Sequence, residues 1–228
     1  MSERDNILAR IRQALAVPAP LPGPDHEPGR PAPVLPVAGD HCRVLPAVGQ
    51  SFDEQVALFR KNAAELRADF RLVPDLSGLA RELKGISAAE GWQQVGSHSG
   101  ELAGTACRAL GLPVLLTDQA FDKRELARCD AGISECDALV AQTGSVVVTS
   151  HSAGGRSLSV LPPHHVVVAR RGQLVPDLPA AFALLKTKYG ASYPSMISII
   201  TGPSRTSDIE RILVLGAHGP KKLTILCL

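Results

Sequence analysis

The chain has 228 residues and is 45% hydrophobic, which is enough to bury one sizeable core. Its net charge of +2 argues against nucleic acid or an anionic membrane surface as a partner, because both need dense basic patches. Its 4% aromatic content also argues against nucleic acid, because it leaves few side chains on which bases could stack. No stretch approaches the roughly 20 apolar residues of a membrane span, and the charged N-terminus lacks the apolar region of a secretory signal. We therefore expect a cytoplasmic protein without a membrane span.

The cysteines and the missing nucleotide motifs predict a chain without a metal or cofactor of its own. The five cysteines stand far apart with no C-x-x-C motif, which indicates reduced thiols rather than a ferredoxin-type iron–sulfur cluster. No G-x-G-x-x-G follows a strand and no G-x-x-x-x-G-K-[ST] occurs, so nicotinamide chemistry has no support. His164 and His165 are adjacent, and in a strand their side chains would point to opposite faces, away from a shared metal.

The first 50 residues divide into two segments. Asp5 to Val17 has apolar residues at helical spacing, which predicts a short amphipathic helix. Residues 18–46 contain nine prolines, which are typical of a semi-extended spacer, or alternatively of a proline-rich ligand for another domain. We expect an N-terminal helix over 1–17, a linker over 18–50 and an α/β domain over 51–228.

Helical and strand patterns alternate from residue 51 onward. Ser51 and Glu54 form a capping box at the start of a helix predicted to run to Phe70. Strands are expected near 71–73, 91–96 and 114–117, with helices near 75–84, 101–110 and 121–129. This alternation predicts a parallel sheet with helices on both faces. Ligands bind such sheets outside the carboxyl ends of strands, where the Ser97-His98-Ser99 loop would lie.

The middle of the chain is rich in strands. Ala138–Ala141 and Val146–Thr149 predict two strands around a tight turn in which Gly144 supplies the unusual backbone angle. Further strands are expected at 157–161 and 166–169, followed by a hairpin turn and a helix over 177–189. Glu135 and Asp137 are candidate carboxylates for a cleft. The alternative for both is a solvated turn charge, which we favour for Asp137 more than for Glu135.

The segment from Met196 to Pro220 is the strongest candidate for a binding site. An apolar strand at 197–200 is broken by Thr201-Gly202-Pro203-Ser204, and Ser207 to Glu210 has the capping-box pattern that starts a helix. A helix start offers backbone N–H groups and the positive end of its dipole, and Ser204, Arg205 and Thr206 would add hydroxyls and a cation. These groups suit a carboxylate or phosphate, although they are also consistent with ordinary helix capping.

A second polar loop, Gly216-Ala217-His218-Gly219-Pro220, precedes a final strand over 221–228. His218 is a candidate proton carrier or ligand, and the alternative is a turn histidine bonded to the backbone.

The segment T-G-P-S-R-T-x-D-I-E from Thr201, followed by L-G-x-H-G-P, resembles the signature of the LUD-domain family. Ser207 and Ala217 depart from the usual Ala and Val. A similar A-x-x-G-[TS] element covers residues 141–145, and the resemblance extends over about 52–228. It implies the sugar-phosphate isomerase and CoA-transferase-like fold, a mostly parallel sheet flanked by helices with an added antiparallel portion.

The family is linked to bacterial L-lactate oxidation together with partner subunits, at least one of which carries iron–sulfur clusters. The resemblance therefore implies a non-redox subunit, with a small carboxylate as a possible ligand. The residues that would bind this ligand are Thr143, Gly144, Thr201, Gly202, Ser204, Arg205 and Thr206. One alternative is an acyl- or phosphoryl-group transferase or isomerase in which Glu135 is the nucleophile or base and His218 the acid–base group. Another is a scaffold for the iron–sulfur subunits.

Overall fold

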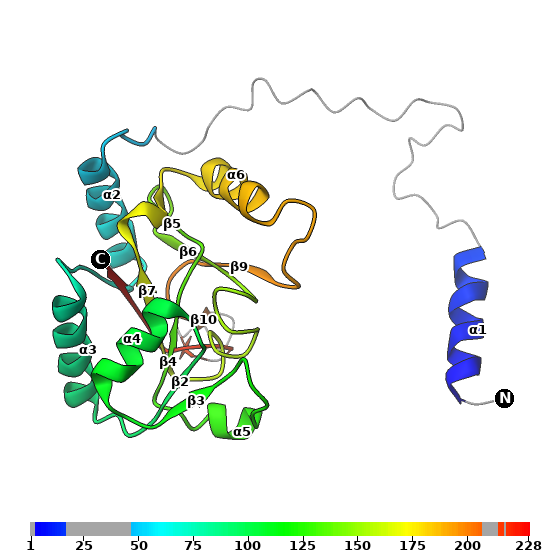
Figure 1. Ribbon diagram of the computed structural model, residues 1–228. Helices are drawn as coiled ribbons and strands as arrows, with labels where there is room; N and C mark the ends of the chain where they lie inside the picture. Colours follow the sequence, from blue (N-terminus) through cyan, green and yellow to red (C-terminus); the bar gives the residue numbers. More distant parts are fainter. Residues whose placement is uncertain (1–2, 17–46, 207–213, 217) are drawn as a thin grey trace. The chain divides into compact units, whose positions relative to one another are not determined.

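The computed structural model describes residues 3–16, 47–206, 214–216 and 218–228 (Figure 1). The chain divides into two compact units, Met1–Val44 and Leu45–Leu228. The first contains α1 (Glu3–Ala16), in the segment where the sequence predicts a helix. The linker predicted over 18–50 lies largely outside the described residues, as does the helix predicted to start at Ser207. Among the described residues, no helix is both long and apolar enough to cross a membrane.

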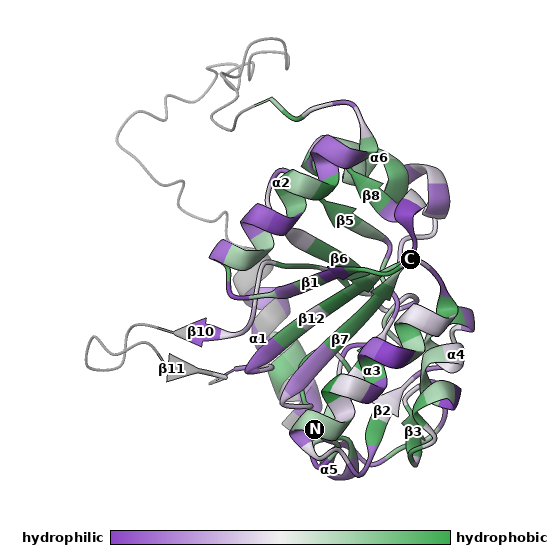
Figure 2. Ribbon diagram, turned by 90° about the vertical axis from the view of Figure 1, so that its left-hand side faces the viewer, coloured by the Kyte–Doolittle hydropathy of each residue, from purple (hydrophilic) through white to green (hydrophobic). Residues whose placement is uncertain are grey.

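The centre of the second unit is a six-stranded sheet in which every pair of neighbouring strands is parallel. Figure 2 shows that its central strands β12 and β7 are hydrophobic toward their carboxyl ends, as expected of strands buried on both faces. In spatial order the six strands are β1 (Asp69–Leu72), β12 (Lys222–Cys227), β7 (His164–Ala169), β4 (Ala131–Ser134), β2 (Val95–Ser97) and β3 (Val114–Leu116).

A smaller sheet supplies the antiparallel portion that the sequence predicts. Its strands, in spatial order, are β8 (Leu174–Val175), β5 (Ala138–Val140), β6 (Ser145–Thr149) and β9 (Ile197–Ile200). β6 pairs antiparallel with both β5 and β9, whereas β5 and β8 are parallel. Gly144 has φ +64° in the turn between β5 and β6, which confirms the predicted glycine turn.

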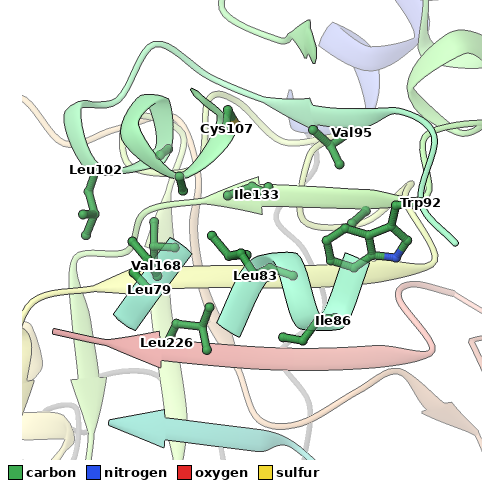
Figure 3. Packing of buried hydrophobic residues seen from close by; sticks show 14 of the residues in the cluster. Leu79, Leu83, Ile86, Trp92, Val95, Leu102, Cys107, Ile133, Val168 and Leu226 are labelled. Carbon is green, nitrogen blue, oxygen red and sulfur yellow. The ribbon is translucent and has the colours of Figure 1, made fainter. Parts of the chain in front are cut away.

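Helices cover both sheets, and the chain forms successive layers. α3 (Leu76–Glu90) and α4 (Glu101–Leu110) pack on one face of the parallel sheet, where Leu83 of α3 contacts strand residues such as Ile133 and Val168 (Figure 3). α2 (Phe52–Glu65) and the smaller sheet pack on the other face. α6 (Leu178–Tyr189) covers the far side of the smaller sheet. The short helices are α5 (Lys123–Leu126) and the 3₁₀ turn η1 (Arg171–Gln173).

The structure corrects several predicted boundaries. The Ser51–Glu54 capping box is confirmed, but α2 ends at Glu65 because Arg67 adopts φ +63° and the following residues join β1. Residues 157–161, predicted as a strand, form turns. Arg205–Thr206, predicted as part of the polar loop before a helix, forms the strand β10 and pairs antiparallel with β11 (Val214–Leu215).

Candidate functional site

The larger candidate site is a cavity of about 740 Å³, called here the strand-end cavity, which opens at the carboxyl ends of three parallel strands. His98 follows β2, Thr117 follows β3 and Glu135 follows β4, and all three line the cavity. Residues 150–155 and the end of α6 complete its wall. This is the position where open α/β sheets bind ligands, and the volume lies within the range of small-molecule sites.

The Glu135 carboxylate is held by the start of α4. Its Oε1 accepts hydrogen bonds from the backbone N–H groups of Leu102 at 2.8 Å and Ala103 at 3.1 Å. Gly100 is the N-cap residue of this helix and makes no side-chain capping bond. Glu135 therefore satisfies the free N–H groups of α4 from a neighbouring strand, which fixes the carboxylate in place.

His98 is buried beside this carboxylate. Its Nε2 accepts a hydrogen bond from the backbone N–H of Glu135 at 3.2 Å, so the proton of the neutral ring resides on Nδ1. Burial lowers the pKa of His98, against the opposing effect of the negative charges on Glu135 and Asp118. His98 is therefore a neutral donor at physiological pH rather than a cation.

Lys188, at the end of α6, forms an ion pair that sequence reasoning did not anticipate. Asp137 Oδ1 accepts hydrogen bonds from Lys188 Nζ at 2.6 Å and from the Tyr189 hydroxyl at 2.7 Å. Burial raises the pKa of Asp137, but the hydrogen bond from Lys188 and the neighbouring hydroxyls outweigh it and lower the pKa. The expectation that Asp137 is a solvated turn charge is wrong: its side chain has 0% exposure.

The second candidate site, called here the loop cavity, has a volume of about 190 Å³ and lies at the segment singled out in the sequence. Thr201, Gly202, Ser204 and His218 all line it. The Ser204 N–H donates to the Pro220 carbonyl at 2.9 Å, so this amide is used inside the protein and is not available to a ligand. The hydroxyls of Thr201 and Ser204 and the imidazole of His218 are polar side chains that this segment contributes to the cavity.

Of two further groups, His165 lines the loop cavity and Arg205 lies beside one of its lining residues, Gly202. The Arg205 guanidinium is exposed, and its Nη2 lies 3.6 Å from the position that a Cβ on Gly202 would occupy. Among the residues that the structure describes, Arg205 has no ion-pair partner. His165 also lines the cavity; its Nε2 shares a hydrogen bond with Ser134 Oγ at 2.8 Å, and burial lowers its pKa to about 3. His165 is therefore neutral, and its Nδ1 has no partner within the described part of the chain.

The other predicted site residues are separated by the fold. Thr143 and Gly144 line neither cavity. Thr143 is connected to Thr201 through Ser145, whose Oγ is hydrogen-bonded to Thr143 Oγ1 at 2.8 Å and to Thr201 Oγ1 at 2.9 Å. Thr206 lies in β10, away from any helix start within the described residues. Glu135 and His218 line different cavities, so the expected acid–base pair is not assembled.

His98 takes the place beside Glu135 that His218 was expected to fill. Its position directly after a predicted strand was the available signal. Lys188 and Tyr189 gave none, because they lie on a helix that no local pattern connects to this cavity.

The fold defines the class of protein: it is an α/β protein in which a second, mainly antiparallel sheet packs on a parallel sheet. A crystal structure of a DUF162 family protein from Deinococcus radiodurans shares this fold with a TM-score of 0.58 and 21% identity, covering 78% of this chain and 99% of that one. The LUD domain model matches residues 111–228, more than half of the chain. The chain belongs to the LUD domain family.

Named relatives are consistent with that assignment. Lactate utilization protein C of Shouchella clausii is 29% identical over 209 residues, covering 85% of this chain and 89% of the relative. The protein of the same name from Halalkalibacterium halodurans is 38% identical over 105 residues, which is 45% of each chain. That from Bacillus licheniformis is 36% identical over 107 residues, covering 46% of this chain and 44% of the relative.

Proposed function

We propose that this protein is a non-redox subunit of a bacterial lactate-utilisation system and that it binds a small carboxylate, such as lactate or pyruvate, in the loop cavity. The role in lactate utilisation is supported by the relatives named lactate utilization protein C. The observation that carries the ligand is the convergence of Thr201, Gly202, Ser204 and His218 on one cavity.

Size supports a ligand of three or four carbons. The loop cavity, at about 190 Å³, is smaller than the roughly 300 Å³ at which pockets for drug-sized molecules begin. A three-carbon acid fills such a space, whereas a nucleotide or a long acyl chain does not fit.

Charge supports an anion. Among the residues that the structure describes, no Asp or Glu lines the loop cavity, and the polar side chains of its lining are serine and threonine hydroxyls and two histidines. Arg205 is not part of the cavity lining, but its guanidinium lies beside Gly202, which is, and it has no carboxylate partner among the described residues. A planar guanidinium can accept a carboxylate with two hydrogen bonds, and the hydroxyls can donate to the remaining lone pairs.

We assign the electron transfer to partner subunits that carry iron–sulfur clusters, since the cysteine spacing of this chain does not suit such a cluster. The transferase or isomerase alternative with Glu135 and His218 acting together is less well supported, because these residues line separate cavities. We place the protein and its partners in the cytoplasm.

Calorimetry with L-lactate and pyruvate tests the ligand site. We expect binding heat with the wild-type protein and at least tenfold weaker binding with Arg205→Ala, because the cation that pairs with the ligand is removed. Arg128→Ala is the matched control, since Arg128 is also exposed but, unlike Arg205, does not lie beside Gly202. Equal heats for wild type and Arg205→Ala, or none for either, would contradict the proposed site.

The subunit role is tested by recovering the protein with its partners from its native cytosol. We expect iron–sulfur proteins in the recovered complex, and L-lactate oxidation that is lost when this subunit is left out. Full oxidation by the remaining subunits alone would count against a required role. The scaffold alternative depends on the N-terminal segment, so complex formation by a variant lacking residues 1–46 would argue against it.

A further inference from the structure

The strand-end cavity is distinct from the proposed carboxylate site and shares no lining residue with it. Its two carboxylates, on Asp118 and Glu135, face a volume nearly four times that of the loop cavity (740 against 190 Å³). Two histidines, His98 and His151, and one lysine, Lys188, line the same space, and none of them was needed for the proposed function. This combination requires an explanation of its own.

Glu135 has the geometry of a base with one oxygen held and one oxygen available. Oε1 is occupied by the N–H groups of Leu102 and Ala103. Oε2 has no hydrogen-bond partner among the described residues, and Glu135 lines the cavity. A carboxylate that the backbone holds in one rotamer is preorganised, because its position does not have to be found again during each reaction.

His98 supplies a neutral donor beside the Glu135 carboxyl group. Its Nε2 is committed to the Glu135 N–H, which leaves Nδ1–H without a partner in the described part of the chain. Both side chains border one point: a Cβ on Gly100 would lie 2.3 Å from Glu135 Oε1 and 2.5 Å from His98 Cε1. The absence of a side chain at Gly100 therefore allows the carboxylate and the imidazole to approach each other at the start of α4.

Removal of a proton from a carbon next to a carbonyl group needs a base for the proton and a hydrogen-bond donor for the carbonyl oxygen. Glu135 and His98 can supply these two groups. We propose that Glu135 and His98 form a proton-transfer site for carbonyl compounds in the strand-end cavity. Glu135 Oε2 removes the proton from the carbon, and the C–H electron pair becomes the C=C bond of an enolate. The carbonyl π pair moves to the oxygen, which His98 Nδ1–H stabilises. The reverse step returns the proton from Glu135 to carbon, so nothing is oxidised or reduced.

Lys188 defines the rest of the substrate class. Its ammonium is paired with Asp137 but remains 49% exposed and lines the cavity, so it can bind an oxygen at the far end of a ligand. The two carboxylates that line the same cavity disfavour a highly charged anion. The substrate is therefore a small hydroxyketone or a keto acid, both of which have the acidic C–H bond that the site requires.

Hydrogen–deuterium exchange in D₂O, followed by proton NMR, tests this site directly. Dihydroxyacetone and pyruvate are the two probes. The probe that exchanges faster shows whether the substrate is a hydroxyketone or a keto acid. We expect the wild-type protein to exchange the proton next to the carbonyl above the buffer rate. Glu135→Gln should lower that rate at least 100-fold, which is the usual contribution of a general base. His98→Gln should lower it as well.

The variants are chosen so that each can fold. The amide oxygen of Glu135→Gln can still accept from Leu102 and Ala103, and its thermal unfolding is measured alongside. Glu101→Gln is the control, because Glu101 is on α4 but lies outside the cavity lining. No exchange above the buffer rate with either probe, or a wild-type rate in folded Glu135→Gln, overturns the proposal. Because calorimetry on Arg205→Ala concerns the other cavity, the two proposals can fail separately.

Discussion

The Glu135 carboxylate occupies the space that Gly100 leaves open at the start of α4. A Cβ on Gly100 would stand 2.3 Å from Glu135 Oε1, the oxygen that accepts two backbone N–H groups of the helix. Helix starts are usually capped by the side chain of the cap residue itself. Here the cap comes from the residue after β4, so the same contact fixes the helix, the strand and the candidate base.

Gly100→Ala is therefore expected to destabilise the fold by about 1–3 kcal/mol, the usual cost of overpacking a tight contact. Gly85→Ala in α3 is the matched control, since no atom lies within 4 Å of its Cβ position. Removing a glycine from a helix interior should stabilise the protein by about 0.5–1 kcal/mol. Urea unfolding measures both. Equal stabilities for the two variants would contradict the close contact at Gly100.

The core under α3 predicts a large difference between two leucines of the same helix. Leu83 is 0% exposed and Leu76 is 51% exposed. Leu83→Ala should cost about 2–5 kcal/mol, because a cavity replaces buried contacts. Leu76→Ala should change stability by less than about 0.5 kcal/mol. Denaturant midpoints of the two variants check the prediction, and a small effect of Leu83→Ala would argue against the packing in this layer.

The Asp137–Lys188 pair predicts that Lys188→Met destabilises the protein, because it leaves a buried carboxylate with a hydroxyl partner alone. The loss should be about 1–3 kcal/mol, below the 3–5 kcal/mol of a fully buried pair, since Lys188 is half exposed. Lys186→Met is the control on the same helix and should be close to neutral. Adding Asp137→Asn to Lys188→Met should recover part of the loss, and a purely additive double variant would contradict the coupling.

His165 predicts an acid-dependent stability. Burial lowers its pKa to about 3, whereas the unfolded chain binds the proton near its ordinary value of 6.5. Below that value the unfolded state holds more protons, so stability falls as the pH drops from 6.5 toward 3, by up to about 1.4 kcal/mol per pH unit. His165→Gln should remove this part of the slope. Urea unfolding at several pH values measures it, and an unchanged slope would exclude His165 as its source.

Much of the fold could be predicted because its signals are local. The capping box at Ser51 and Glu54, the glycine turn at Gly144 and the alternation of helix and strand patterns each depend on residues close in the chain. The opposite directions of His164 and His165 follow from the two-residue period of a strand, and the two rings accordingly contact Glu90 and Ser134. The family signature likewise lies within one short segment.

The sequence by itself determined most of the strands, although not the turns at 157–161, and it identified Thr201 to Ser204 and His218 as polar groups that could bind a ligand. The tertiary structure decided which of these groups meet. Glu135 lies beside His98 because β4 and β2 are neighbours in the sheet, and His218 belongs to another cavity. The physical reason is that strand order and helix docking depend on the burial of surfaces contributed by the whole chain, which no local pattern contains.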